Sequence, residues 1–459
     1  MEGRNQLEGI PPEWAGGRTQ SRAPWPPHLQ RVNEAARRGR QTRFTALLHH
    51  VDVAALRRAY ERVRRDASAG VDGQTAALYA QSLDENLAAL CARVHTGRYR
   101  PQPVRRVYIP KADGGRRPLG IPALEDKLVQ SAVAEVLGAI YEADFLPFSY
   151  GFRPGRSAHQ AIDALHKAVM TRRVNWVLDA DIRSFFDSVD HELLLRAVAV
   201  RIADRRVLRL IEQWLSAGVM ESGQWSETTV GTPQGSAISP LLANIFLHYA
   251  LDTWVAGWAR EAGRGRVAIV RYADDFVLGF QRESDARQLR EALAERLGKC
   301  GLRLHEDKTR LLEFGRFAAE RRAQRGERRP ETFDFLGFTH YCGVSRNGRF
   351  VVKCKTQSKR MARKLKALRQ EAQFRRHTPV AAQHHWLCQV LRGHYAYFGL
   401  VHNYRSMDNF RFQVERLWHA ALKRRSEKGL TWGRFRELLR HFPLPKPHIT
   451  RHWQPVEAG

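Results

Sequence analysis

Two adjacent aspartates, Asp274 and Asp275, lie between two apolar stretches in residues 266–280, which read Arg-Val-Ala-Ile-Val-Arg-Tyr-Ala-Asp-Asp-Phe-Val-Leu-Gly-Phe. Neighbouring strand residues point to opposite faces, so a tight turn between two strands is the better place for both acids. Two buried carboxylates repel each other unless a cation compensates them. Arg271 or a divalent metal could do so. The alternative is a surface hairpin whose turn the acids only cap.

A third carboxylate could come from Asp179 or Asp181, in the short apolar run 175–182. Oxygen ligands alone are typical of Mg2+ sites. Two such ions could activate an attacking 3′-hydroxyl and stabilise a leaving pyrophosphate. The acids therefore predict metal-assisted phosphoryl chemistry.

The charge balance indicates a polyanionic partner. Lys plus Arg number 76 and Asp plus Glu 47, a net charge of +29, and nucleic acid is the commonest polyanion. The alternative is a generally basic protein without such a partner. The five cysteines form no C-x-x-C pair, so neither a zinc site nor a disulfide framework is expected, and a reducing cytosol fits. No signal peptide and no membrane span are expected.

The pattern of the 459 residues alternates between helical and strand-like segments. It predicts a flexible basic arm to about residue 40, helices over 44–97, and a loop over 228–239 that opens a helix. Further helices are expected at 125–141 and 283–299. Strands are expected at 104–109, 175–182, 333–338 and 349–353, and a hairpin with a Gly-Gly turn at 111–121. The composition becomes markedly basic near Arg346, where we expect a domain boundary.

The stretch Tyr272–Asp275 resembles the signature turn of reverse transcriptases. Five further blocks resemble, in the same order, those of group II intron-encoded reverse transcriptases: 149–156, 177–191, 231–245, 302–310 and 333–338. Residues 383–400 and 422–432 are similar to the maturase (thumb, or X) domain of those proteins.

This resemblance implies an α+β right-hand polymerase, with fingers and palm built on antiparallel sheet and followed by a helical thumb. The expected domains are an N-terminal arm (1–42), fingers with an N-terminal extension (43–170), the catalytic palm (171–345) and the thumb/maturase domain (346–459). The family pattern prefers Asp181 to Asp179, which would face away or tune the site.

The resemblance also implies the residues of the site. Asp181, Asp274 and Asp275 would be catalytic and, with the backbone of Ile182, would hold two Mg2+ ions, for which Mn2+ could substitute. The nucleotide would meet Lys111, Arg117, Phe186, Gln234 and Lys308. The alternatives are a solvated hairpin for Lys111 and Arg117, ordinary core for Phe186 and a salt bridge for Lys308.

In the basic C-terminal part, we expect Trp386, Leu387, Val390 and Leu391 to pack inside the thumb. RNA would be bound by Arg392 and by the cations of residues 359–366, above all Lys359, Arg360, Arg363 and Lys364. The alternative is that residues 346–376 form a merely solvated face.

The implied function is an RNA-directed DNA polymerase that binds its group II intron RNA, assists splicing and copies the intron into DNA during retrohoming. The implied partners are the intron RNA, an RNA template with a DNA primer, dNTPs and target DNA, in a bacterial cytoplasm near the nucleoid. The DNA-binding segment and endonuclease of many relatives are not expected. The alternatives are a splicing factor with vestigial polymerisation, and a domesticated retron, diversity-generating or defence-linked reverse transcriptase.

Overall fold

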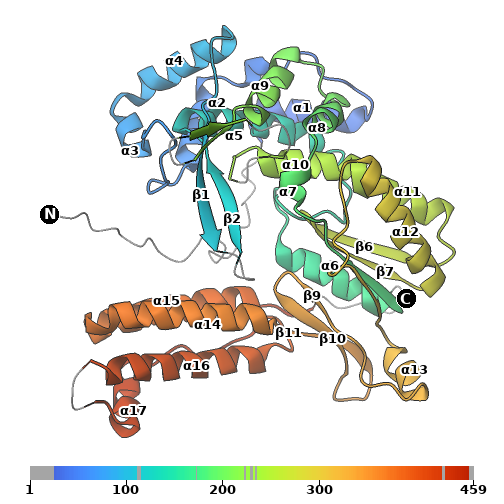
Figure 1. The fold of residues 1–459 in the computed structure, drawn as a ribbon, viewed down its shortest axis with the longest axis vertical. Helices are drawn as coiled ribbons and strands as arrows, with labels where there is room; N and C mark the ends of the chain where they lie inside the picture. The colour runs from blue at the N-terminus through green and yellow to red at the C-terminus, as the bar shows by residue number, and fades with distance from the viewer. Residues whose placement is uncertain are drawn as a thin grey trace. The chain divides into compact units, whose positions relative to one another are not determined.

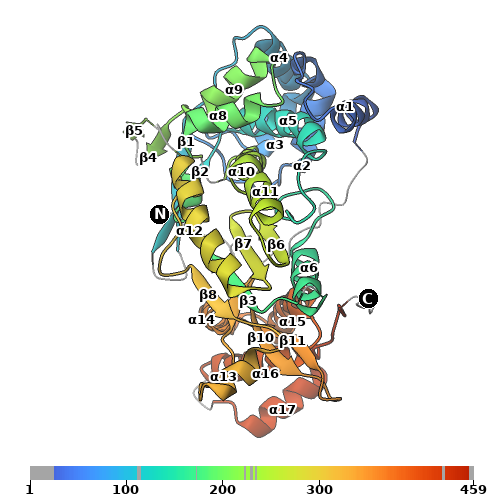
Figure 2. The ribbon, with the colours of Figure 1, turned by 90° about the vertical axis from the view of Figure 1, so that its right-hand side faces the viewer.

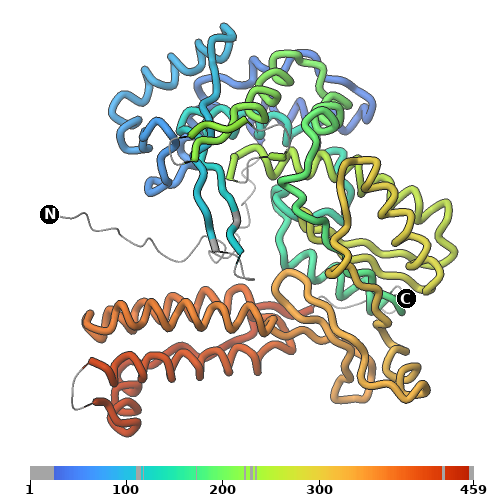
Figure 3. Tube along the Cα trace, in the orientation of Figure 1, coloured from blue at the N-terminus to red at the C-terminus, as the bar shows by residue number. Residues whose placement is uncertain are grey.

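The computed structural model describes residues 25–110, 115–171, 173–221, 224–227, 231–232, 235–425 and 429–453 (Figures 1 and 3). Helices and small sheets alternate along the chain, which confirms the predicted α+β class. The contacts divide the described chain into two compact units. The first unit comprises residues 25–157 and 178–311, and the second comprises 158–177 and 312–453.

A buried helix, α5 (Leu124–Tyr141), organises the helical part of the first unit. Most of its residues are buried because α1, α2 and α10 pack around it. Six further helices complete this part: α1 (Pro27–Arg38), α2 (Val53–Arg62), α3 (Ala76–Tyr79), α4 (Leu83–His95), α8 (His191–Ala199) and α9 (Arg205–Leu215).

Helix α1 corrects the prediction of a flexible arm up to residue 42. Pro27 starts the helix, where its missing N–H costs nothing. Leu29 and Ala36 are fully buried, and the buried guanidinium of Arg201 donates to the carbonyl oxygens of Ala36 (3.2 Å) and Arg40 (2.7 Å). The apolar stripe is too narrow to stand out in a polar sequence, yet it is enough to dock the helix.

A four-stranded sheet in the order β2-β1-β4-β5 adjoins these helices. Strands β1 (Val104–Pro110) and β2 (Arg116–Ile121) are antiparallel, with Val107 opposite Leu119. The strand predicted at 104–109 is confirmed, and it pairs with residues 116–121 of the segment predicted as a hairpin. Its turn, residues 111–114, lies outside the described residues. Strand β4 (Val219–Glu221) runs parallel to β1, and β5 (Gln224–Ser226) forms the edge.

A second four-stranded sheet has the order β6-β7-β3-β8. Its strands are β3 (Trp176–Ala180), β6 (Val267–Tyr272), β7 (Asp275–Phe280) and β8 (Arg310–Glu313). Helix α12 (Glu283–Lys299) packs against β7, as Figure 2 shows. The short α7 (Phe185–Ser188) follows β3, and α10 (Ser239–Leu247), a π-helical turn (His248–Asp252) and α11 (Thr253–Glu261) precede β6.

The second unit combines a small sheet with long helices. Strands β9 (Phe333–Phe335), β10 (Phe338–Val344) and β11 (Phe350–Thr356) pair antiparallel in the order β11-β10-β9. The helices are α6 (Ala158–Thr171), α13 (Ala318–Gln324), α14 (Ser358–Phe374), α15 (Val380–Phe398), α16 (Tyr404–Lys423) and α17 (Trp432–His441).

Leu387 and Leu391 are buried in the core of this unit, and Trp386 and Val390 pack against it, so this part of the prediction is confirmed. The predicted boundary between residues 345 and 346 falls inside the turn of the β10–β11 hairpin. The change to a basic composition therefore marks an exposed turn and helix rather than a break in the fold. The four predicted domains do not coincide with the two compact units. Among the described residues, no helix is long and apolar enough to cross a membrane.

Candidate active site

Asp274 and Asp275 lie at the β6–β7 turn. Tyr272 and Asp275 pair across the two strands, so Ala273 and Asp274 form a two-residue connection. Ala273 adopts a left-handed conformation, with φ of 57°, and is buried. Asp274 is half-buried and Asp275 is exposed. The predicted tight turn thus places both acids at one end of the hairpin.

Arg271 does not compensate these acids, so the first of the two predicted alternatives is wrong. Its side chain is fully buried, and it donates to both carboxylate oxygens of Asp252 at 2.7 and 2.6 Å. Its other donors reach Asn244, Ser149 and the carbonyl oxygen of Ala273 at 2.8–2.9 Å. The charge of Arg271 is therefore matched by Asp252, beneath the turn.

Asp181 directly follows β3, the strand next to β7 in the sheet. Its carbonyl oxygen accepts from the amide of His305 (2.8 Å), and Ile182 forms a bridge with Leu304. Its carboxylate is 2.7 Å from the ammonium of Lys308. Asp179, the other candidate, accepts from Arg310 at 3.4 Å. For Lys308, the structure thus contains the salt bridge that was the alternative to a role at the triphosphate.

The donor set suits a hard divalent cation. Asp181, Asp274, Asp275 and the Ile182 carbonyl would offer oxygen only, which Mg2+ prefers. In the described part of the chain, however, no three His, Cys, Asp or Glu side chains are gathered closely enough to hold an ion together. Lys308 provides the counter-charge to Asp181. A metal ion bound at that carboxylate would compete with Lys308 for its negative charge.

This competition predicts that Lys308→Met tightens metal binding. An exposed ion pair is worth up to about 1 kcal/mol, so the dissociation constant for Mn2+ is expected to fall by about two- to fivefold at low ionic strength. Calorimetric titration of the protein with Mn2+ measures this. Lys299→Met removes a comparable surface pair with Glu295 and should change nothing. Weaker Mn2+ binding by Lys308→Met would contradict the competition.

The neighbouring rings of Phe185 and Phe186 differ in burial. Phe185 is 2% exposed and belongs to the core, whereas Phe186 is half-buried, with the two rings edge to face. The backbone of α7 holds the start of the next predicted motif. The amide of Thr232 donates to the Phe186 carbonyl (2.7 Å), and that of Gly231 donates to Val189 (2.9 Å). Phe186 therefore neighbours the loop that carries Gln234.

The far end of this loop is fixed to β2 and α5. Gly235 has φ of 112°, and a Cβ there would lie 2.6 Å from the carbonyl oxygen of Gly120. The side chain of Gln130 accepts from Ser236 Oγ (2.7 Å) and the amide of Ala237 (3.2 Å). The loop thus connects α7 with β2 and α5. Gln234 and Lys111 lie outside the described residues, as does the side chain of Arg117, so their roles stay predictions.

Gly235→Ala should therefore disturb nucleotide binding. Both the positive φ and the approach to Gly120 exclude a Cβ, so the loop must shift. We expect the dNTP KM to rise by about tenfold or more, since misplacement near 1 Å is costly in an active site. Steady-state incorporation kinetics measure this. Gly257→Ala on α11 is the control, because a Cβ there meets nothing within 4 Å. An unchanged KM would remove this loop from the nucleotide site.

The predicted RNA-binding cations do not all share one surface. Lys359 and Arg392 are exposed, and Arg360 and Arg363 are half-buried. Lys364 is 8% exposed, and burial lowers its pKa. It lies on the inner side of α14 with Leu368 and Ala372, so its assignment to RNA is corrected. Lys366, within the predicted segment 359–366, is exposed on the same helix, and so is Arg369, which the sequence patterns did not single out.

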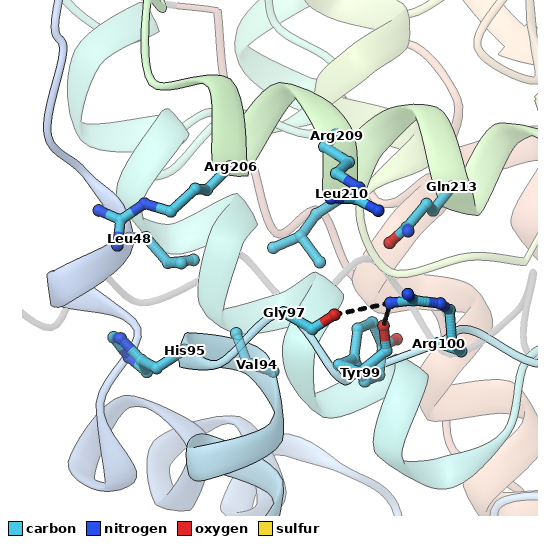
Figure 4. Close-up of a pocket in the computed structure, with 10 residues that line it drawn as sticks. All are labelled: Leu48, Val94, His95, Gly97, Tyr99, Arg100, Arg206, Arg209, Leu210 and Gln213. Atoms are coloured by element: carbon cyan, nitrogen blue, oxygen red, sulfur yellow. Dashed lines mark hydrogen bonds between the residues drawn. The ribbon is translucent and has the colours of Figure 1, made fainter.

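A small hollow lies apart from these residues, between the end of α4 and α9 (Figure 4). Its volume is about 70 Å³, with Val94, Tyr99 and Leu210 among its lining residues and Arg100 and Arg209 at its edge. None of the predicted site residues is among the residues that line it.

Comparison with known proteins decides the family. Residues 109–340, half of the chain, match the family described as "Reverse transcriptase (RNA-dependent DNA polymerase)". The chain belongs to this reverse transcriptase family. The match includes Asp181, Phe186, Asp274, Asp275 and Lys308, and the predicted family and enzyme class are confirmed.

The chain is also similar to individual proteins, two of which are encoded in introns. The chain is 39% identical over 273 residues to Protein YkfC of Escherichia coli K12, covering 53% of this chain and 71% of YkfC. It is 43% identical over 173 residues to the Group II intron-encoded protein LtrA of Lactococcus lactis, covering 38% of this chain and 28% of LtrA. A 91 kDa protein in the cob intron of Schizosaccharomyces pombe is 36% identical over 223 residues, covering 47% of this chain and 27% of that protein. The likeness to intron-encoded proteins is confirmed, although the chain spans only about a quarter of LtrA and of the cob intron protein.

Proposed function

We propose that this reverse transcriptase copies RNA into DNA at Asp181, Asp274 and Asp275, and that its own RNA is a group II intron whose splicing it assists. The main observation in support is the β6–β7 turn, which presents two adjacent carboxylates beside the strand that leads to Asp181. The guanidinium of Arg271, at the base of the turn, donates to Asp252.

The three aspartates and the Ile182 carbonyl would hold the divalent ions. When bound, two Mg2+ ions would favour the ionised primer 3′-hydroxyl and stabilise charge on the departing pyrophosphate. Phe186 would lie under the incoming sugar, where a ring excludes a 2′-hydroxyl, and Gln234 would line the nucleotide. Lys111 and Arg117 would bind the triphosphate. Lys308, once released from Asp181, would lie within reach of the negative charge of the triphosphate.

In the second unit, the exposed cations of α14 and Arg392 of α15 would bind RNA. Lys359, Lys366 and Arg369 face solvent on one helix, and the aromatic side chains of α15 pack into the core rather than outward. Electrostatic contact with phosphates is therefore a better description of this surface than base stacking. The implied target DNA, the retrohoming reaction and a cytoplasmic, nucleoid-associated location belong to the same proposal.

Replacing Lys359, Lys366 and Arg369 with Ala should weaken RNA binding and flatten its salt dependence. Each lost phosphate contact reduces the slope of log K against log salt by about 0.7–0.9, so a reduction of about 2–3 is expected. Binding of labelled RNA transcribed from the DNA around the gene measures this. Replacing Arg287, Arg290 and Lys299 on α12 removes equal charge as a control. An unchanged slope in the α14 variant would place the RNA surface elsewhere.

The intron assignment has a direct test. If the gene lies within a group II intron, the flanking DNA encodes the catalytic RNA domains, and the purified protein should accelerate splicing of that transcript. Flanking DNA without such an RNA would instead favour a domesticated reverse transcriptase.

A further inference from the structure

The base of the catalytic turn is occupied by a fully buried ion pair. Arg271 and Asp252 are both 0% exposed, and two hydrogen bonds join them at 2.6 and 2.7 Å. A buried pair contributes little net stability on average, because desolvation offsets the attraction. Its presence beneath Asp274 and Asp275 therefore calls for a role beyond stability.

The side chain of Arg271 also contacts Ala273, the turn residue with the least favourable backbone conformation. Ala273 has φ of 57°, a conformation that costs an L-residue about 1 kcal/mol or more. Arg271 donates to the carbonyl oxygen of Ala273 at 2.9 Å. Such a conformation persists only where surrounding contacts stabilise it. Here the hydrogen bond from the Arg271 guanidinium to the Ala273 carbonyl is one such contact.

A second set of contacts fixes the backbone that leads into Ala273. The backbone of residues 148–150 pairs with Arg271, through Arg271 N to Phe148 O (2.9 Å) and Tyr150 N to Arg271 O (2.8 Å). Gly151 then lies so close to the turn that a Cβ there would be 2.3 Å from the amide nitrogen of Ala273. Only glycine allows this approach.

Asn244 connects the two contacts. Its Oδ1 accepts from Arg271 at 2.9 Å, and its Nδ2 donates to the carbonyl oxygen of Gly151 at 2.7 Å. Asn244 is buried on α10, the helix that follows the loop with Gln234. One side chain therefore links the helix after the nucleotide loop to the residues that hold the catalytic turn.

We propose that Arg271, Asn244 and Gly151 are positioning residues that set the placement of the Asp274 and Asp275 carboxylates for metal binding. The inference rests on the proposed function and deepens it, because it assigns the geometry of the metal ligands to groups that touch neither metal nor substrate. Lysine cannot replace Arg271, since a single ammonium cannot reach Asp252, Asn244, Ser149 and Ala273 at once.

The test compares Arg271→Lys with Arg201→Lys. Arg201 is a matched control, because it is 1% exposed and bound to Asp144 (2.7 Å), and because its side-chain hydrogen bonds do not involve the β6–β7 turn. Both variants should lower Tm. Arg271→Lys alone should weaken Mn2+ binding by about tenfold or more and lower kcat by about 100-fold, with the dNTP KM changed less than threefold. Equal Mn2+ affinities in the two variants would overturn the positioning role.

Two further variants leave the ion pair in place, should Arg271→Lys fail to fold. Gly151→Ala and Asn244→Ala should reproduce the loss of Mn2+ affinity and of kcat, and wild-type Mn2+ binding in both would overturn the proposal. Failure of the proposed function can be distinguished from failure of the positioning role. If the proposed function fails, the wild-type protein itself extends no primer, while the Mn2+ titrations still compare the positioning variants.

Discussion

Asp274→Asn is expected to reduce DNA synthesis by about 1000-fold or more, while the affinity for RNA changes less than about threefold. Removing one negative charge from the proposed metal site should weaken the stabilisation of charge in the transition state, where such terms are worth several kcal/mol. In the proposed function RNA is bound by cations of the second unit, so RNA binding should persist. Nucleotide incorporation and RNA binding, measured on the same preparation, give the two values.

Asp66→Asn is the matched control for this variant. Asp66 is an exposed aspartate paired with Arg64 in a surface turn of the first unit, so its loss removes the same charge without touching the site. It should leave synthesis and RNA affinity unchanged. If Asp274→Asn instead lowered RNA affinity as much as synthesis, the two functions would share one site, contrary to the proposed function.

Acidification is expected to unfold the second unit. Burial lowers the pKa of His166 and His340 to about 4 and that of His394 to about 3, from 6.5. The unfolded chain therefore binds more protons below pH 6.5, so stability is retained above that pH and lost as the pH falls towards 4. At pH 5 each histidine would cost about 2 kcal/mol, and Tm should fall by about 10 °C or more relative to pH 7.

His394→Phe separates this effect from general acid denaturation. Both ring nitrogens of His394 are buried without a hydrogen-bond partner, and the ring stacks on Phe410 at 3.9 Å. Phenylalanine keeps the packing and removes the titration. About a third of the pH-dependent shift in Tm should disappear, as followed by thermal melts at pH 7 and pH 5. A variant with the wild-type shift would place the titration elsewhere.

Local patterns predicted the parts of the site that lie close together in sequence. The β6–β7 turn and the helix at 283–299 follow from apolar spacing and from the two acids, and the structure has both. The strand before Asp181 is likewise a local signal. These features depend on neighbouring residues, so one sequence is enough to find them.

The partners of Arg271 could not be predicted in this way. Asp252 is 19 residues away and Ser149 is 122 residues away, and no spacing rule connects them. Arg271 was one of two candidates for the counter-charge of the acids, beside a divalent metal, because its closeness in sequence was the only guide. Gly151 could have been suspected, since a glycine in a polar turn often marks a close backbone approach.

The burial of Lys364 within the basic helix α14 could not be predicted from the sequence either. Lys364 and Lys366 are chemically the same, and only the helical phase set by Leu368 and Ala372 separates the buried lysine from the exposed one. The boundary near Arg346 failed for a related reason. A basic composition indicates that a segment is exposed to solvent, and an exposed hairpin turn can be as basic as a linker between domains.

Extension of oligo(dT) on poly(rA) with Mg2+ tests whether this chain polymerises DNA on an RNA template at Asp181, Asp274 and Asp275. We expect incorporation of dTTP that requires the divalent ion and is lost in Asp274→Asn. Purified wild-type protein that binds this template-primer and adds no nucleotide, with either Mg2+ or Mn2+, would contradict it.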